Sequence, residues 1–223
     1  MYSEKNLTSV SKLIENDICV SIGTDGASSN DNLDLIEELK SVKGDEEAIL
    51  DRFYKDLEFG TAGLRGVIGA GTNRMNIYTV GRVTQGLSDC INSKKSGGSV
   101  AVSYDPRINS ELFAKRAAGV LAANGIQAYI FDSLRPTPEL SFAVRELGAF
   151  GGVVITASHN PPEYNGYKLY DERGCQLVPH VNDLVVAEIE KIDNVSGISP
   201  SVTVSTKVVK NGYVSDEVNV SGK

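Results

Sequence analysis

A buried strand that ends in a proline-rich turn is the feature of this sequence that most constrains its fold. Residues 153–156, VVIT, are apolar and mostly β-branched, which predicts a strand buried on both faces. Small and polar residues follow at once, and Pro161 and Pro162 cannot continue a ladder of strand hydrogen bonds. Ser158 is therefore expected just beyond a strand end, on a stiff loop, where α/β folds commonly place reacting groups.

The next turn signal is expected to bring a lysine back toward this loop. Asn165 and Gly166 form a dipeptide that is typical of tight turns. A turn at this point would reverse the chain and direct Lys168 toward Ser158. By pattern alone, an ordinary connection between a strand and a polar turn explains the segment as well as a reactive site does.

Alternating helix and strand patterns predict the fold class. Helical spacing of apolar residues predicts helices over residues 45–57, 77–91, 110–124, 137–147 and 181–192, and β-rich runs predict strands at residues 100–103 and 127–131. Asn109 or Ser110 is expected to cap the third helix and Thr137 the fourth. The order of the elements predicts a three-layer α/β/α sandwich with a mixed, mostly parallel sheet. Residues 167–170 and 176–178 flank a turn and predict a hairpin.

The composition of the chain argues against several functional classes of protein. The chain has 22 basic and 29 acidic side chains and a net charge of −7, which argues against non-specific nucleic-acid binding. Its apolar runs are too short to span a bilayer, and its first residues lack the pattern of a secretion signal. The three cysteines, Cys19, Cys90 and Cys175, show no paired spacing and are interpreted as reduced core thiols. We therefore expect a cytoplasmic protein without nucleic-acid or membrane partners.

A glycine-rich segment lies between the first two predicted helices. Residues 59–76, FGTAGLRGVIGAGTNRMN, contain five glycines that permit close approach of the backbone to a ligand. The segment lacks the Gly-Lys-Ser/Thr of a P-loop and does not follow a strand as a dinucleotide-binding motif would. Taken alone, such a segment is more often a turn than a phosphate-binding loop.

Three motifs together resemble those of the α-D-phosphohexomutases, especially the bacterial phosphoglucomutase/phosphomannomutase type. The string TASHNP at residues 156–161 matches the family's active-serine loop, GTAGLRG at residues 60–66 resembles its opening signature, and DPR at residues 105–107 resembles its D-x-R loop. The likeness extends from about residue 45 to about residue 192. It implies the family's first domain, whose serine, here Ser158, is phosphorylated in the resting enzyme.

The resemblance implies an isomerase that acts as an intramolecular phosphotransferase. Such an enzyme moves a phosphoryl group between the 1- and 6-positions of a hexose phosphate through a bisphosphate that reorients. Phospho-Ser158 would donate and later recover the group. Lys168 and Arg65 are the catalytic candidates for proton transfer and for stabilising the transferring phosphoryl group, with an ordinary surface arginine as the alternative for Arg65.

The other candidate residues lie around the serine. His159 is included among the catalytic candidates but is expected to position the loop rather than act as a base, because adjacent side chains in an extended chain point apart. Asn160 is expected to hold the loop through backbone bonds, and Asn160 and Arg107 are the candidates for cofactor binding. Three roles stay open for Arg107: bracing the serine loop, binding an anion, or only pairing with Asp105.

The sequence also departs from the family. There, Mg²⁺ bridges the serine phosphate and three aspartates of a D-G-D-x-D-R loop in the second domain, and this string is absent here, as is the G-E-x-S-G sugar loop. Ser158, through its phosphate, is the one metal-binding candidate. We expect the first domain of a hexosephosphate mutase, with hexose phosphate as substrate, glucose 1,6-bisphosphate as activator and the missing mutase domains as partners. The alternative is a non-catalytic domain that binds sugar phosphate or protein, and the choice among glucose, mannose and pentose phosphates stays open.

The N-terminal segment resembles a different family. Residues from about 10 to 40 are similar to a strand–loop–helix unit of amidohydrolase-type adenosine or methylthioadenosine deaminases, in which the aspartate equivalent to Asp25 approaches the metal. The rest of such a metal site is absent, and one βα unit cannot build a barrel. We therefore expect a foreign extension at residues 1–44, a mutase first domain at residues 45–192, and a tail or linker at residues 193–223 that forms one or two strands or remains loose.

Overall fold

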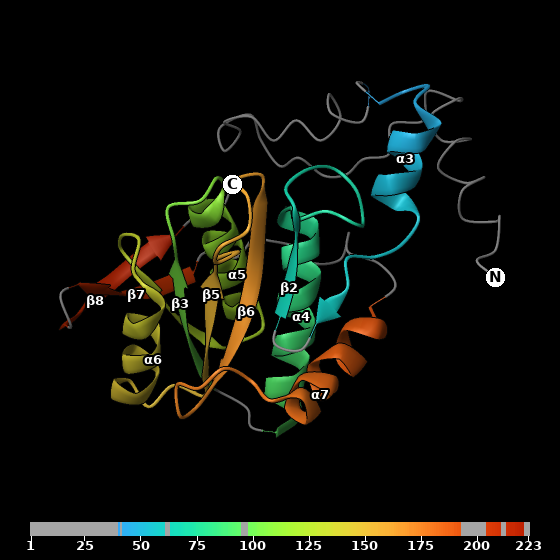
Figure 1. Cartoon of the computed structure of the whole chain (residues 1–223). Helices are drawn as coiled ribbons and strands as arrows, with labels where there is room; N and C mark the ends of the chain where they lie inside the picture. Colours follow the sequence, from blue (N-terminus) through green and yellow to red (C-terminus); the bar gives the residue numbers. More distant parts are fainter. Residues whose placement is uncertain are drawn as a thin grey trace.

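The computed structural model describes residues 40, 42–60, 63–94, 98–192, 204–210 and 213–220 (Figure 1). Its helices are α3 (Glu46–Phe53), α4 (Ile77–Lys94), α5 (Ser110–Ala123), α6 (Thr137–Glu146) and α7 (Pro179–Glu190). Its strands are β1 (Phe59–Gly60), β2 (Gly63–Val67), β3 (Ser99–Tyr104), β4 (Gln127–Phe131), β5 (Gly151–Ile155), β6 (Tyr164–Asp171), β7 (Val204–Lys210) and β8 (Tyr213–Val220). Asp25, on which the deaminase-like prediction depends, lies outside the described residues. Cys19 also lies outside them.

The strands form one mixed sheet in the order β1-β2-β6-β5-β3-β4-β7-β8. Strand β3 pairs in parallel with β4 and β5, and β4 pairs in parallel with β7. Strands connected by short turns, namely β1–β2, β5–β6 and β7–β8, pair antiparallel, because only crossover connections allow parallel pairing. The predicted α/β/α sandwich with a mixed sheet is confirmed. The expectation that the sheet is mostly parallel is wrong for the described strands, because the three parallel pairs around β3 and β4 are outnumbered by four antiparallel pairs. Part of the predicted tail, β7 and β8, extends this sheet beyond β4.

Helices cover the two faces of the sheet unequally (Figure 1). The larger core packs α4, α5 and α7 against one face, where Val153 and Ile155 of β5 point inward. The smaller core packs α6 against the other face, where Val154 meets Leu140 and Val144. Strand β5 is thus buried on both sides, as predicted, and each of these apolar side chains stabilises the fold by roughly 1.5–3 kcal/mol. The strand that leads to Ser158 is therefore rigidly held.

The predicted turn at Asn165 and Gly166 is wrong. Both residues lie inside β6 and pair with residues of β2. The chain reverses earlier, after the prolines, where the Tyr164 N–H donates to the Pro161 carbonyl at 3.0 Å. Lys168 consequently lies on the strand that pairs with β5, opposite Val154, rather than on a separate returning segment.

Long-range contacts explain why these two turn-forming residues adopt strand structure. The fully buried Asn165 side chain donates to the Ile108 carbonyl and to Ser110 Oγ, both at 2.9 Å, instead of to its own turn. A Cβ atom at Gly166 would lie 2.6 Å from the Thr156 carbonyl oxygen, so close approach of the neighbouring chain requires glycine here. Local turn preference is overridden by tertiary contacts.

Several helix ends differ from the sequence-based expectation. Pro136 is the N-cap of α6, so Thr137 is the first helical residue and the predicted Thr137 cap is wrong. Asn109 is the N-cap of α5, as expected, but it adopts φ 61° and makes no side-chain cap hydrogen bond. Helix α3 begins after its N-cap Asp45, which accepts from Ala48 N–H at 2.9 Å, and ends at Phe53.

The predicted hairpin after β6 is reduced to one bridge between Tyr170 and Gln176 and a hydrogen bond from Leu177 N–H to the Leu169 carbonyl. Cys175 lies exposed in the intervening turn, so its prediction as a core thiol is wrong, whereas Cys90 is buried. None of the helices in the described ranges combines the length and apolar character that a membrane span requires.

Replacement of Gly166 by alanine should destabilise the domain. The added methyl group would overlap the Thr156 carbonyl, and such overpacking typically costs about 1–3 kcal/mol. Urea denaturation measures the free energy of unfolding. Gly119→Ala in α5 is the matched control, because no atom lies within 4 Å of its Cβ position; it should be neutral or stabilising by up to about 1 kcal/mol. Equal effects of the two substitutions would contradict this packing argument.

Candidate active site

Ser158 lies three residues beyond the end of β5, and its backbone is left-handed. Ala157 is buried, whereas Ser158 is exposed and has φ 59°. A left-handed conformation costs a non-glycine residue roughly 1–2 kcal/mol, so the surroundings must stabilise it. One contribution is the hydrogen bond from Ser158 N–H to Thr156 Oγ1 at 2.9 Å. Ser158 is thus held in place by its backbone while the residue remains exposed to solvent.

The left-handed turn brings His159 beside the serine. The distance between Ser158 Oγ and His159 Nδ1 is 3.5 Å, which is longer than a strong hydrogen bond. Adjacent side chains point apart only in an extended chain, so this expectation is wrong for Ser158 and His159, because Ser158 is left-handed. His159 therefore lies beside the Ser158 hydroxyl oxygen.

Arg107 holds the serine loop through its whole guanidinium group. Nη1 and Nη2 donate to carbonyl oxygens of the loop, namely Pro161 (2.9 Å), Tyr164 (3.0 Å), Ser158 (2.8 Å) and Asn160 (2.7 Å). Nε lies 3.4 Å from Asp105 Oδ2. The sequence left three roles open for Arg107. The structure shows two of them together, bracing of the serine loop and the ion pair with Asp105. All N–H groups of Arg107 already have partners, so anion binding by this residue would require breaking the brace.

A second set of hydrogen bonds fixes the position of the Arg107 guanidinium, which acts as the brace of the serine loop. Asp105 Oδ1 accepts from the Arg107 backbone N–H at 3.0 Å and from Ser110 Oγ at 2.8 Å. Ser110 Oγ also accepts from Asn165 Nδ2 at 2.9 Å, which links the start of α5 to β6. Sequence reasoning did not identify Ser110 and Asn165 as supports, because their partners are distant in the chain.

Arg65 connects strand β2 to the serine loop. Its side chain is exposed, and Nη1 donates to Asn160 Oδ1 at 2.7 Å. Within the described residues this is the one side-chain hydrogen bond that Arg65 makes, so the other N–H groups are available to a ligand. Asn160 thus holds the loop through its side chain as well as through its backbone, whose N–H donates to the Ala157 carbonyl at 3.2 Å.

Lys168 lies near Arg65 on the same face of the sheet. Gly63 pairs with Lys168 and Arg65 pairs with Gly166, so the two cationic side chains are diagonal neighbours. Burial lowers the pKa of Lys168 below its usual value, the charge of Arg65 lowers it further, and Asp105 partly opposes this. A lower pKa increases the fraction of lysine that is neutral near neutral pH, and only the neutral amine can accept a proton.

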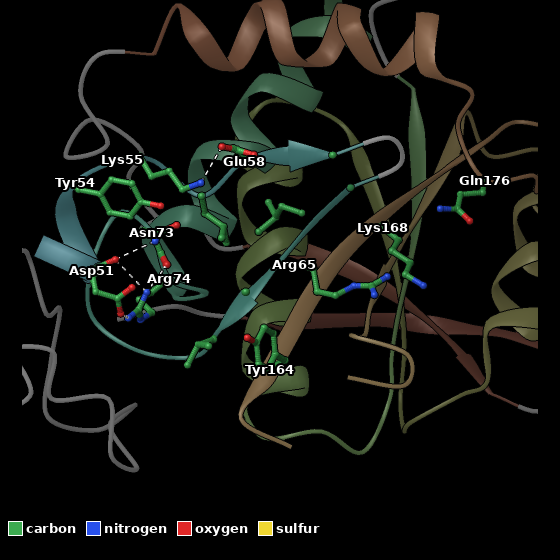
Figure 2. A pocket seen from close by; sticks show the side chains of 16 residues that line it. Asp51, Tyr54, Lys55, Glu58, Arg65, Asn73, Arg74, Tyr164, Lys168 and Gln176 are labelled. Carbon is green, nitrogen blue, oxygen red and sulfur yellow. Dashed lines mark hydrogen bonds and ion pairs between the residues drawn. The ribbon is translucent and has the colours of Figure 1, made fainter. Parts of the chain in front are cut away.

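These two cations line a groove with a volume of ≈ 870 Å³ (Figure 2). Arg65, Lys168, Tyr164 and Gln176 lie on one side of it, and residues of α3 and of the segment after β2 lie on the other. Sequence reasoning missed Tyr164 and Gln176 as site residues. Alternate residues of a strand share one face, so Tyr164, Gly166 and Lys168 lie on the same face. If Asn165 and Gly166 had been assigned to a strand, this spacing would have identified Tyr164 as a site residue.

The donor set near the serine does not fit a magnesium ion by itself. In the ranges that the structure describes, no three potential metal-ligating side chains of His, Cys, Asp or Glu lie together. Asp105, which follows β3 at the same sheet edge, is engaged with Arg107 and Ser110. Because Mg²⁺ prefers near-octahedral oxygen coordination, we derive no chemical step through it in this chain.

Comparisons with known proteins agree with this geometry. Residues 56–196 match the model of the family described as phosphoglucomutase/phosphomannomutase, alpha/beta/alpha domain I. A phosphoglucomutase from Staphylococcus saprophyticus is 40% identical over 197 residues, which are 87% of this chain and 35% of that protein. A phosphoglucomutase from Staphylococcus aureus strain MRSA252 is 43% identical over 140 residues, which are 63% of this chain and 25% of that protein.

A solved structure is also similar to this chain. A protein from Thermus thermophilus that is assigned as a phosphomannomutase superposes with a TM-score of 0.57 at 36% sequence identity, covering 60% of this chain and 30% of that chain. The chain therefore spans between about a quarter and a third of the length of the relatives that it matches.

Substituting Arg107 by lysine should loosen the serine loop. An ammonium group has three donors and cannot bind four carbonyls and a carboxylate at once, so several charge-assisted hydrogen bonds are lost. We expect amide hydrogen exchange at Asn160 and Tyr164 to accelerate by about tenfold or more, since each lost bond contributes roughly 1.5–3 kcal/mol. Arg173→Lys, in an exposed ion pair outside the loop, is the control. Unchanged exchange in Arg107→Lys would show that the brace is dispensable.

Removing the charge of Arg65 should raise the pKa of Lys168. The arginine charge opposes protonation of the lysine, so Arg65→Gln allows the proton to bind more tightly and moves the titration to higher pH. NMR titration of labelled lysine side chains measures this shift directly. Arg173→Gln, on the exposed turn after β6, should leave the Lys168 titration unchanged. A Lys168 pKa that stays constant or falls in Arg65→Gln would be inconsistent with this electrostatic coupling.

Proposed function

Because the chain belongs to the phosphoglucomutase/phosphomannomutase family and contains its domain I, we propose that it is the phosphoserine-bearing part of a hexosephosphate mutase. The observation that supports this most directly is the exposed Ser158, held in a left-handed turn by the Arg107 guanidinium, which donates to four carbonyl oxygens. Such a fixed hydroxyl at the end of a buried strand suits repeated phosphoryl transfer at one oxygen.

The proposed half-reaction transfers the phosphoryl group from phospho-Ser158 to a sugar hydroxyl. The bond between phosphorus and the Ser158 oxygen breaks, and a bond between phosphorus and the sugar oxygen forms. The sugar hydroxyl loses its proton, and the released Ser158 oxygen takes up a proton from the solvent to which Ser158 is exposed. Lys168 is the proposed proton acceptor because its pKa is lowered, and Arg65 is proposed to stabilise negative charge on the phosphoryl group. His159 is proposed to position the serine oxygen, from which its Nδ1 lies 3.5 Å.

Complete turnover is proposed to require the rest of the enzyme. The chain spans about a third of the Staphylococcus saprophyticus phosphoglucomutase, and its own residues do not provide a magnesium site in the described ranges. Mg²⁺ in phosphoryl transfer neutralises charge on the transferring group, and we propose that the missing mutase domains supply its carboxylate ligands. Glucose 1,6-bisphosphate is the proposed activator, hexose phosphate the proposed substrate and the cytoplasm the proposed location, without nucleic-acid or membrane partners.

The proposed domain boundaries follow the sequence expectation: an extension at residues 1–44, domain I at residues 45–192 and a tail at residues 193–223. Support comes from the family match at residues 56–196. Within the tail, pairing of β7 with β4 favours treating that strand as an addition to the domain I sheet.

Incubation with glucose 1,6-bisphosphate and Mg²⁺ should place one phosphoryl group on the chain. Intact-mass measurement should show the adduct in the parent chain and in Ser133→Ala, whose serine follows β4 at the same sheet edge, but not in Ser158→Ala. Reversible binding without any adduct would instead favour a non-catalytic sugar-phosphate domain.

Conversion of glucose 1-phosphate to glucose 6-phosphate by the purified chain tests its proposed incompleteness. With the bisphosphate and Mg²⁺ present, we expect little or no turnover, because the chain lacks both the aspartate loop and the sugar loop of the family. Robust turnover, comparable to that of a complete mutase, would refute the claim that other domains are needed.

A further inference from the structure

Asn165 is a buried amide that has no part in the proposed reaction. It lies in β6 without exposure to solvent, and alternation along the strand places it on the same face as Tyr167 and Leu169, which belong to the larger core. A polar side chain in such a place is unfavourable unless its hydrogen bonds are made. The contacts of this amide therefore indicate which parts of the domain it connects.

The Asn165 amide is fully engaged, and both of its donors bind outside its own strand. Nδ2 donates to the Ile108 carbonyl and to Ser110 Oγ at 2.9 Å each, which uses both of its hydrogens. Oδ1 accepts from the Gly166 N–H at 2.8 Å. A residue of β6 is thus hydrogen-bonded to the loop that follows β3 and to the start of α5, more than fifty residues earlier in the chain.

The two donors of Asn165 bind on either side of a strained residue. Asn109 lies between Ile108 and Ser110, adopts φ 61° and makes no side-chain cap hydrogen bond at the start of α5. A left-handed backbone is unfavourable for a non-glycine residue, so the surroundings must stabilise it. Asn165 fixes the positions immediately before and after Asn109, and it thereby holds the turn that joins residues 105–107 to α5.

The Ser110 hydroxyl transmits this constraint to Asp105. A hydroxyl has a single proton, and Ser110 Oγ gives it to Asp105 Oδ1 at 2.8 Å, because a carboxylate can only accept. The same oxygen accepts from Asn165 Nδ2, which can only donate. Ser110 is 1% exposed, so solvent does not compete for its hydroxyl. The hydrogen bonds from Asn165 to Ser110 and from Ser110 to Asp105 therefore form a relay with one direction of donation.

Asp105 connects this relay to the guanidinium that braces the serine loop. Its Oδ1 also accepts from the Arg107 backbone N–H at 3.0 Å, and its Oδ2 lies 3.4 Å from Arg107 Nε. The carboxylate orients the guanidinium, whose other N–H groups donate to four carbonyl oxygens, including that of Ser158 at 2.8 Å. A displaced carboxylate would shift the guanidinium, and the backbone of Ser158 would shift with it.

We propose that Asn165 is a positioning residue for phosphoryl transfer at Ser158, and that it acts through Ser110 and Asp105 on the Arg107 guanidinium. Asn165 is buried and does not line the groove, so it contacts neither the sugar nor the phosphoryl group. Its role is to keep the Ser158 oxygen in place, because a displacement of about 1 Å at a reacting atom can slow a reaction by roughly a hundredfold. The inference rests on the proposed function and assigns part of its rate to a residue outside the groove.

Single-turnover labelling of Ser158 by glucose 1,6-bisphosphate and Mg²⁺ tests this role. Asn165→Leu keeps a branched side chain of similar size but removes the three hydrogen bonds of the amide, and it should lower the maximal labelling rate by about ten- to a hundredfold. The bisphosphate concentration for half-maximal labelling should change by less than about twofold, because Asn165 does not contact the ligand. A role in stability alone would instead reduce the fraction of chains that become labelled and leave the rate of the folded chains unchanged.

Tyr167→Phe is the matched control for Asn165→Leu. It removes a buried hydrogen bond on the same face of β6, between the Tyr167 hydroxyl and Thr84 Oγ1 at 3.1 Å, which links β6 to α4 rather than to the serine loop. Its maximal labelling rate should stay within about twofold of that of the parent chain. A folded Asn165→Leu chain that is labelled at the parent rate would overturn the inference and leave the proposed function intact. An equal loss of rate in Tyr167→Phe would overturn it as well.

Ser110→Ala breaks the relay at its middle residue and leaves β6 unchanged. It should also lower the maximal labelling rate, and combining it with Asn165→Leu should lower the rate by less than about a further twofold, because both substitutions interrupt the same path. This variant decides the question if Asn165→Leu does not fold. Labelling of folded Ser110→Ala at the parent rate would show that Arg107 is oriented without the relay, which contradicts the proposal.

Amide hydrogen exchange separates the inference from the proposed function. In Asn165→Leu and in Ser110→Ala, exchange at the Asn160 and Tyr164 N–H groups should accelerate by about tenfold, whereas Tyr167→Phe should match the parent chain. If the bisphosphate does not label the parent chain, the proposed function fails, and accelerated exchange would still show that Asn165 positions the serine loop. Unchanged exchange at both amides in both relay variants would overturn that positioning.

Discussion

The guanidinium of Arg107 is the interaction on which the candidate site depends. It binds three carbonyl oxygens of the serine loop and one at the first residue of β6, and an ion pair with Asp105 orients it. A left-handed serine costs roughly 1–2 kcal/mol, whereas each hydrogen bond to a charged group contributes roughly 1.5–3 kcal/mol, so the brace outweighs the strain. Because Asp105 is bonded to Ser110, and Ser110 to Asn165, the loop is connected through one polar network to both α5 and β6.

The unequal helix layers explain how one domain provides both a rigid strand and an open binding surface. Helices α4, α5 and α7 cover one face of the sheet, and α6 covers the other face only over β3 and β5. Strand β5 is therefore fixed from both sides, while β2 and β6 present Arg65 and Lys168 to solvent within a few residues of the serine loop. The groove that results is bounded by α3, which Asn73 and Arg74 hold through polar contacts.

The sequence by itself determined the elements whose signals are local. The apolar run before Ser158 predicted a buried strand with the serine just past its end, because burial on both faces leaves a continuous run of apolar residues. The helical period predicted the positions of the five helices in the described part of the chain, with end errors of a few residues. The strings TASHNP and GTAGLRG predicted the family, and the match at residues 56–196 confirms it.

Tertiary structure decided what depends on partners far apart in the chain. Asn165 and Gly166 became part of a strand because a buried amide and a close carbonyl contact override their local turn preference. Arg107 took the role of a brace because its acceptors lie more than fifty residues away, which no local pattern records. The left-handed turn at Ser158, which brings His159 to its side, and the exposure of Gln176 in the groove likewise follow from packing. Local sequence encodes burial and backbone preference, whereas hydrogen-bond partners across the sheet are fixed only once the strands are aligned.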